Sequence, residues 1–227
     1  MSESHRTPAE RPAGAPAARE THGLPAATVF DALGAEYERA FAGSDAHRAS
    51  LDRLLERLAP DSRVLDVGSG TGVPTARRLA GAGHRVVGVD VSPVMTALAA
   101  RQVPDAEFRC GDIRELPWAD GEFDAVCVYF SLLQMSRGEQ GELLGRLGRA
   151  VRPGGHLVVA TVPVDVADVS AEFMGQPVVV SSFGEEEFTA LVAGAGFAVE
   201  ERHSTLFTPD HPAGAPEPHL FLHCRRV

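Results

Sequence analysis

The spacing of hydrophobic positions along this chain changes near residue 63. Before that point, over residues 26–59, apolar side chains recur at roughly helical spacing, and Gly43-Ser44-Asp45 interrupts the run. From Arg63 onward, short apolar runs alternate with segments of helical length. The pattern therefore predicts two N-terminal helices followed by a region in which strands and helices alternate.

The alternating region predicts five strands and the helices that connect them. The strands are expected at residues 63–67, 85–90, 106–110, 123–128 and 155–161, and the helices near 73–82, 93–102 and 138–150. Strict alternation implies right-handed crossovers and a largely parallel sheet that is covered on both faces. This pattern is typical of a doubly wound α/β fold.

The C-terminal third of the chain predicts the rest of the sheet. Residues 162–183 are expected to be irregular, and a helix is expected at 184–194. Strand-like runs at 196–204 and 219–226 would complete a seven-stranded sheet with a hairpin-like last pair. The predicted architecture is a Rossmann-like, mostly parallel seven-stranded sheet with helices on both faces and a helical N-terminal lid.

Length and composition favour one domain with a short tail. The 227 residues suffice for one α/β domain but fall short of two full ones. The first 25 residues carry four prolines and no apolar run of the kind found in signal peptides. Residues 1–24 are therefore expected to be a disordered tail, and residues 25–227 a single folded domain.

Charge and composition exclude several functional classes. The net charge of −10 disfavours nucleic acid as a partner, because binding to phosphate backbones depends on clustered Lys and Arg. All 21 basic residues are arginine, which excludes Schiff-base chemistry and the lysine of a P-loop. No stretch approaches the roughly 20 apolar residues that a membrane-spanning helix needs. The expected partner is a small molecule.

The three cysteines indicate the compartment. Cys110, Cys127 and Cys224 are too widely spaced for a disulfide framework or a CxxC metal pair. They are expected to be buried thiols of a cytoplasmic protein, either a monomer or a homodimer.

The residues that follow the predicted strands carry the candidate chemistry, because in an open parallel sheet the ligand lies beyond the carboxyl ends of the strands. The segment 68–72, Gly-Ser-Gly-Thr-Gly, follows the first strand and lets a ligand approach the backbone. Asp90 ends the second strand and can accept hydrogen bonds from both hydroxyls of a ribose. After the third strand, Asp112 can accept from an adenine amine while Ile113 packs on the ring.

The spacing of the glycines argues against a dinucleotide. The G-x-G-x-x-G fingerprint needs a glycine at the sixth position, but counting from Gly68 that position is Val73, and the third glycine falls one place early at Gly72. NAD or FAD is therefore disfavoured.

These motifs resemble those of class I S-adenosylmethionine-dependent methyltransferases, in the branch that acts on small molecules. Residues 66–72, Asp-Val-Gly-Ser-Gly-Thr-Gly, match the family's E/D-x-G-x-G-x-G motif after the first strand. The resemblance covers roughly residues 60–161. It continues through the motifs at residues 88–92, 111–113, 123–126 and 152–155.

The resemblance implies a methyltransferase domain over residues 25–227 that binds S-adenosyl-L-methionine. In such a domain residues 25–59 are the N-terminal helices and residues 162–183 an insertion on the substrate side. Gly68 and Gly70 would line the methionine part of the cofactor, with Tyr129 beside it. The full set implied for the cofactor is Tyr37, Asp66, Gly68, Ser69, Gly70, Asp90, Val91, Gly111, Asp112, Ile113, Tyr129 and Gln134.

The segment after the fourth strand separates subclasses of the family. Residues 129–135 lack the Asn/Asp-Pro-Pro-aromatic tetrad of methyltransferases that act on exocyclic amines of nucleic acids. Cys127 follows Val126 and not a proline, unlike the nucleophile of cytosine-C5 enzymes, and is expected to lie in the core. Residues 125–138 lack acidic ligands of the kind that catechol-type enzymes offer to Mg²⁺, so no metal is expected.

Apolar side chains outside these motifs are candidates for an acceptor pocket, although core packing would explain each of them equally well. The candidates are Phe30, Phe41, Phe130, Met135, Phe173, Met174 and Phe183. Four histidines near the C-terminus, His203, His211, His219 and His223, are candidates for removing a proton from a hydroxyl acceptor, with His203 the first to test.

The preferred hypothesis is methyl transfer from S-adenosylmethionine to an oxygen, nitrogen or carbon of a small, largely apolar metabolite, with secondary metabolism as one setting. One alternative is a member of the same fold that keeps the cofactor but catalyses a cyclisation or rearrangement. The other is an oxidoreductase that binds NAD.

Overall fold

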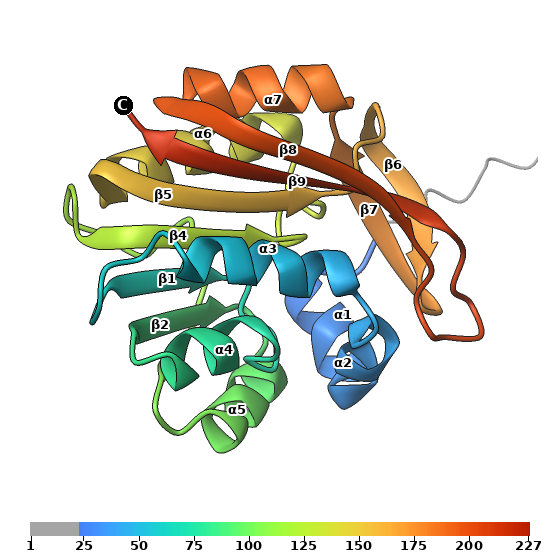
Figure 1. The fold of residues 1–227 in the computed structure, drawn as a ribbon. Coiled ribbons are helices and arrows are strands. Elements are labelled where there is room, and N and C mark those ends of the chain that lie inside the picture. The colour runs from blue at the N-terminus through green and yellow to red at the C-terminus, as the bar shows by residue number, and fades with distance from the viewer. Residues whose placement is uncertain (1–22) are drawn as a thin grey trace, which may run out of the picture.

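The computed structural model describes residues 23–227, so nearly all of the expected tail at residues 1–24 lies outside it. A seven-stranded sheet of order β3-β2-β1-β4-β5-β9-β8 forms the centre (Figure 1). Its strands are β1 Arg63–Val67, β2 Arg85–Asp90, β3 Glu107–Cys110, β4 Phe123–Tyr129, β5 Val151–Thr161, β8 Phe197–Phe207 and β9 Glu217–Arg226. Strands β1 to β5 are parallel, and β9 is antiparallel to both of its neighbours. The predicted fold class is confirmed.

Helices cover both faces of the sheet. They are α1 Ala26–Leu33, α2 Ala35–Phe41, α3 Asp45–Leu55, α4 Thr75–Gly81, α5 Pro93–Gln102, α6 Arg137–Ala150 and α7 Glu185–Gly194. Because successive strand residues point to opposite faces, Val64 of β1 packs in a core with α3 and α4, whereas Leu65 packs in a core with α6 and α7. This two-sided burial explains the nearly continuous apolar runs of the central strands.

Residues 26–59 form three helices, so the expectation of two is wrong. The break expected at residues 43–45 is present, and Ser44 is the N-cap of α3. Its hydroxyl accepts a hydrogen bond from the backbone N–H of His47 at 3.3 Å. A second break separates α1 from α2 at Gly34, whose φ of +48° favours glycine. The spacing of apolar residues continues across Gly34, which is why this break was missed.

Residues 162–183 contain a β-hairpin, so the expectation of an irregular segment is wrong. Strand β6 Val166–Phe173 pairs antiparallel with β7 Gln176–Ser182 in a separate two-stranded sheet. Met174 and Gly175 form the turn with φ of +48° and +80°, as expected for a type I′ turn. Nearly every side chain of β6 is exposed, so the alternation that normally identifies a strand is missing.

The hairpin and the first two helices pack against each other. Their shared apolar cluster contains Val29, Leu33, Ala40, Met174 and Val178. The backbone N–H of Leu24, just before α1, donates to the carbonyl of Pro177 in β7 at 2.9 Å. Together they form a cap near the ends of the central strands, which Figure 1 shows at the right of the sheet. We call α1, α2, β6 and β7 the cap.

Cys127 and Cys224 are buried as expected, but Cys110 is exposed. It ends β3, the edge strand of the sheet, where a neighbouring strand is present on one side alone. The expectation of a third buried thiol is therefore wrong.

Across residues 23–227, no helix has the length and apolar composition needed to cross a membrane.

A glycine in α6 permits close contact with the end of α7. A Cβ atom on Gly148 would lie 2.3 Å from the backbone carbonyl oxygen of Ala195, which follows α7. Gly145, in the same helix, has no atom within 4 Å of the equivalent position. Gly148 and Gly145 can therefore be compared directly, because they lie in the same helix and differ in whether a methyl group can be accommodated.

We expect Gly148→Ala to lower the free energy of unfolding by about 1–3 kcal/mol, because the backbone of one helix must move to admit the methyl group. Gly145→Ala is the control, and it should raise the same quantity by up to about 1 kcal/mol because alanine has the higher helix propensity. Urea unfolding followed by circular dichroism measures both. Equal effects at the two positions would contradict the close contact.

Candidate functional site

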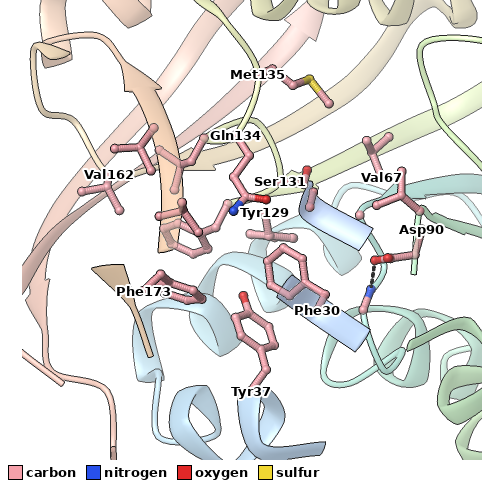
Figure 2. Close-up of a pocket in the computed structure, with 18 of the residues that line it drawn as sticks. Phe30, Tyr37, Val67, Asp90, Tyr129, Ser131, Gln134, Met135, Val162 and Phe173 are labelled. Carbon is pink, nitrogen blue, oxygen red and sulfur yellow. Dashed lines mark hydrogen bonds between the residues drawn. The ribbon is translucent and has the colours of Figure 1, made fainter. Parts of the chain in front are cut away.

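A cavity of about 440 Å³ lies between the central sheet and the cap (Figure 2). One side is formed by the segments that follow β1, β2, β3 and β4. The other side is formed by α1, α2, β6 and β7, together with Glu217 at the start of β9. The cavity thus lies at the carboxyl ends of the parallel strands, where ligands of such sheets bind.

Ten of the twelve residues that the resemblance implies for the cofactor line this cavity. They are Tyr37, Gly68, Gly70, Asp90, Val91, Gly111, Asp112, Ile113, Tyr129 and Gln134. Asp66 and Ser69 are buried and are absent from the lining. The structure thus brings together residues from the ends of four strands and from α2, and their contacts with a cofactor stay a prediction.

Two glycines bring the loop after β1 close to the cavity. Gly68 and Gly70 have φ of +67° and +53°, which other residues rarely adopt. A Cβ atom on Gly68 would also lie 2.3 Å from the Cβ atom of Ser131, in the loop after β4. Glycine is thus required at residue 68 for its conformation and for the approach of Ser131, a cavity residue that the sequence did not indicate.

The carboxylate of Asp90 is held by backbone N–H groups. Its Oδ2 accepts from Gly70 at 2.8 Å, the dashed line in Figure 2, and its Oδ1 accepts from Ser92 at 2.9 Å. Each carboxylate oxygen has two lone pairs, so one backbone bond to each leaves both able to accept another hydrogen bond. Ser92 caps α5 by accepting from the N–H of Met95 at 3.0 Å, so the helix cap does not require Asp90.

Asp66 is a buried carboxyl group next to this loop. Burial, followed by the nearby charge of Asp90, raises the pKa of Asp66 to about 8. Within residues 23–227 the side-chain atoms Asp66 Oδ2, Ser69 Oγ, Ser131 Oγ and Gln134 Oε1 are buried and have no hydrogen-bond partner. Buried polar atoms are normally paired, and Ser131 and Gln134 line the cavity, so their unpaired atoms fit a polar ligand there.

Asp112 already binds a neighbouring side chain. Its Oδ1 accepts from the backbone N–H of Arg114 at 2.9 Å and from Nε at 3.0 Å, while its Oδ2 accepts from Nε at 3.0 Å and Nη2 at 2.6 Å. These bonds lower the pKa of Asp112. Arg114 also forms an ion pair with Glu139 of α6. An adenine amine could therefore reach Asp112 only if the Arg114 side chain moved.

Five of the seven predicted acceptor residues line the cavity, namely Phe30, Phe41, Phe130, Met135 and Phe173. The ring of Tyr37 lies 5.4 Å from that of Phe30 and 4.8 Å from that of Phe41, measured between centroids. Phe173 of β6 packs against the same rings, at 6.3 Å from Tyr37. Together Phe30, Tyr37, Phe41 and Phe173 form what we call the aromatic wall, part of which Figure 2 shows.

Met174 and Phe183 do not line the cavity, so the expectation for these two residues is corrected. Met174 is buried in the apolar cluster of the cap. Phe183 lies in the main core beside Phe188, and the guanidinium of Arg137 lies 4.6 Å from the centre of its ring. Core packing thus accounts for both side chains.

His203 is not placed to act as a base, so that prediction is wrong. It lies on the edge strand β8, is exposed, and is absent from the cavity lining. His211 lies 3.4 Å from Glu36. His223 is buried with its Nε2 2.9 Å from Ser50 Oγ, and burial lowers the pKa of His223 to about 4.

The sequence reasoning missed an acidic residue at the cavity. Glu217 lines it, and the Nε2 of buried His219 lies 2.8 Å from Glu217 Oε1. Residues two apart in a strand share a face, so this spacing was the available signal. The strand pairing that brings Glu217 to the cavity depends on tertiary structure.

In the described part of the chain, no three His, Cys, Asp or Glu side chains form a group that could hold a metal ion. The expectation that no metal takes part stays a prediction.

Comparison with protein families and curated proteins finds methyltransferases. Residues 64–155 match a family described as a methyltransferase domain. A demethylmenaquinone methyltransferase of Beutenbergia cavernae is 47% identical over 113 residues, covering 50% of this chain and 45% of that protein. One of Mycolicibacterium vanbaalenii is 38% identical over 138 residues, covering 59% and 58%. The chain thus spans about half the length of the curated relatives it matches.

Solved structures show the same fold. The 1,6-didemethyltoxoflavin-N1-methyltransferase of Burkholderia thailandensis, determined with 1,6-didemethyltoxoflavin and S-adenosylhomocysteine, matches with a TM-score of 0.66 at 23% identity, over 88% of this chain and 86% of that one. The 4+2 cyclase SpnF also matches with a TM-score of 0.66, at 22% identity, over 90% of this chain and 98% of that one. Identities this low show likeness of fold and nothing more.

The raised pKa of Asp66 leads to an expected dependence of stability on pH. The pKa is about 8 in the folded chain against an ordinary value of 3.8. Between these values the folded state holds a proton that the unfolded state releases, so the free energy of unfolding should fall as the pH rises. Asp66→Asn should flatten this slope.

Urea unfolding of the ligand-free chain at about pH 5 and about pH 8 measures the slope. Asp105→Asn is the control, because Asp105 is exposed and lies away from the cavity. The same slope in Asp66→Asn and in the unchanged chain would contradict the raised pKa.

Proposed function

We propose that this chain carries a class I S-adenosylmethionine-dependent methyltransferase domain, which transfers a methyl group to an oxygen, nitrogen or carbon atom of a small, largely apolar molecule. The observation that carries the proposal is the arrangement around the loop after β1. There, the left-handed glycines at 68 and 70, the anchored Asp90 carboxylate and the unpaired buried polar atoms of Ser131 and Gln134 all line the cavity.

These residues fit S-adenosyl-L-methionine in their chemistry. Asp90 retains acceptor capacity for the two hydroxyls of a ribose. Of the unpaired atoms at the cavity, the amide oxygen of Gln134 is an acceptor suited to an ammonium group, and the hydroxyl of Ser131 is a donor suited to a carboxylate. Buried Ile113 offers an apolar surface to an adenine ring. We therefore assign the twelve residues named above to the cofactor, with Asp112 dependent on release by Arg114.

When bound, the cofactor supplies a methyl group on an electrophilic sulfonium. The chain's own residues then have to bring an acceptor into line and keep water out. The aromatic wall gives the acceptor an apolar surface on the cap side of the cavity. An aromatic acceptor fits these rings, and the curated relatives are named demethylmenaquinone methyltransferases.

Several wider expectations are part of the same proposal. The domain would span residues 25–227, with the two cap segments on the substrate side. The protein would work in the cytoplasm as a monomer or homodimer, without a nucleic-acid partner, which the net charge of −10 supports.

A second candidate function is catalysis without methyl transfer, in which the bound cofactor helps to hold or polarise a substrate for cyclisation or rearrangement. The fold is compatible with it, because the cyclase SpnF shares this fold over 90% of this chain. The same fold thus serves two chemistries, and the outcome depends on the acceptor and its placement.

Binding of S-adenosylhomocysteine tests the cofactor site. We expect it to bind in calorimetry, and Asp90→Ala to weaken binding by about tenfold or more because hydrogen bonds to a charged acceptor are lost. Asp105→Ala, at an exposed position, should leave the affinity unchanged. Tight binding of NAD, or full affinity in Asp90→Ala, would contradict the assignment.

Transfer of a labelled methyl group separates the two candidate functions. We expect S-adenosylmethionine that carries a labelled methyl group to pass the label to a member of a panel of small phenols, quinols and aromatic amines. Mass spectrometry of the extracted products measures transfer, and Asp90→Ala should reduce it because cofactor binding is weakened. A substrate that is rearranged while the donor keeps its label would favour the second function.

A further inference from the structure

One carboxylate at the cavity is not used by the proposed cofactor site. Glu217 starts β9, whereas the cofactor contacts proposed from the sheet lie at or just after the ends of β1 to β4. Its side chain is 28% exposed, so it is neither enclosed in the core nor free in solvent. It lines the same cavity as Tyr37 and Phe173 of the aromatic wall. Glu217 is therefore available to a molecule bound against that wall.

A buried histidine fixes this carboxylate in place. The His219 side chain is 1% exposed, and its Nε2 lies 2.8 Å from Glu217 Oε1. Its ring packs against Phe130 and Phe207, with centroids 4.3 Å and 5.2 Å away. A carboxylate can only accept, so the hydrogen of His219 lies on Nε2 and is donated to Glu217. The second oxygen, Oε2, is left for another donor.

The other polar groups near the acceptor are poorly suited to take up a proton. Burial, followed by the carboxylates of Glu217 and Asp90, raises the pKa of Tyr37, which keeps its hydroxyl protonated and therefore a donor. Figure 2 shows Tyr37 and Gln134 both directed into the cavity. The amide of Gln134 does not titrate. Glu172 of β6, the carboxylate that the cap contributes to the cavity, is exposed.

The charge of the cavity restricts what binds there. Among the described residues that line it, the acidic ones are Asp90, Asp112, Glu172 and Glu217, and the basic one is Arg114. Arg114 is already paired with Asp112 and Glu139. A carboxylate or phosphate on the acceptor would therefore meet repulsion, whereas a neutral hydroxyl or an amine would meet a hydrogen-bond acceptor.

We infer that Glu217, positioned by His219, accepts a hydrogen bond from a hydroxyl or amino group of the acceptor and takes up its proton during methyl transfer. The inference rests on the proposed function and narrows its substrate class. The acceptor is a small aromatic or apolar molecule whose nucleophilic oxygen or nitrogen carries a hydrogen, and it bears no anionic group near that atom.

The step balances in atoms and charge. A bond forms between the acceptor heteroatom and the methyl carbon as the bond from that carbon to sulfur breaks, and sulfur keeps the electron pair. The O–H or N–H bond breaks, its electron pair stays on the heteroatom, and the proton moves to Glu217 Oε2. The positive charge of the sulfonium and the negative charge of Glu217 are both neutralised, so no net charge is created in the cavity.

If the Glu217–His219 pair had only a structural role, the variants would behave differently from what the inference predicts. If Glu217 served only to satisfy buried His219, replacing it would affect stability without changing which ligands bind. If it receives the acceptor's hydrogen, the cavity should distinguish two ligands that differ only in that hydrogen. The pair 4-nitrophenol and 4-nitroanisole has this property, and the absorbance of the phenol also reports its protonation state.

The experiment titrates both probes into the full chain saturated with S-adenosylhomocysteine. We expect 4-nitrophenol to bind about tenfold more tightly than 4-nitroanisole, because hydrogen bonds to charged groups are among the stronger ones. Its absorbance should show that the bound phenol is neutral. Glu217→Gln should abolish most of this preference, whereas Glu187→Gln, at an exposed position in α7, should retain it.

The role of His219 is tested by two variants. His219→Leu removes the donor to Glu217 and should reduce the preference for 4-nitrophenol. His219→Gln supplies an amide donor and should restore part of it, which a merely space-filling role would not do. Thermal unfolding and S-adenosylhomocysteine affinity report whether these buried substitutions fold, and Glu217→Gln decides the question if they do not.

The outcomes separate the inference from the function on which it rests. Failure of the unchanged chain to bind S-adenosylhomocysteine would contradict the proposed function itself. If S-adenosylhomocysteine binds, three results would overturn the inference alone: equal affinity for the two probes, no binding of either, or a preference that persists in Glu217→Gln.

Discussion

The hydrogen bond between the backbone of Gly70 and the carboxylate of Asp90 is the contact on which the site depends. It joins the loop after β1 to the end of β2, and it can form because Gly70 has a left-handed conformation. The same carboxylate accepts from Ser92, so its orientation is set from both sides. The bond fixes the loop after β1, which carries several of the proposed cofactor contacts.

The central sheet could be predicted because each buried strand is marked by a local run of apolar residues. The cap could not be predicted in this way. The bounds expected for β1 and β2 agree with the structure, since apolar runs bounded by turns and helices identify buried strands. Strand β6 exposes almost all of its side chains, and its pairing with β7 depends on a turn whose conformation composition does not reveal. The break at Gly34 was missed for a related reason, since glycine permits a left-handed φ without requiring it.

The cofactor side of the cavity could be predicted more completely than the acceptor side. Strand ends meet in any parallel sheet, so the position of Asp90 and Asp112 at the cavity could be predicted without knowing the packing, while their contacts with a cofactor stay a prediction. Choosing between His203 and His219 needed the register of β8 on β9, which contains an irregularity between Val199 and Glu201. In the structure His203 is exposed, whereas His219 is buried and contacts the carboxylate of Glu217. The hydrogen bonds from the Arg114 side chain to Asp112 likewise depend on side-chain geometry, which the sequence does not reveal.

The cap is built from two segments, residues 26–41 and 166–182, that lie far apart in the sequence and share one apolar cluster. Both lie outside residues 64–155, the part that matches the methyltransferase family. The shape of the cap side of the cavity is therefore set jointly by two stretches of chain outside the matched part. A change in the apolar packing of one segment alters the support of the other, while the loops after β1 and β2 do not belong to that cluster.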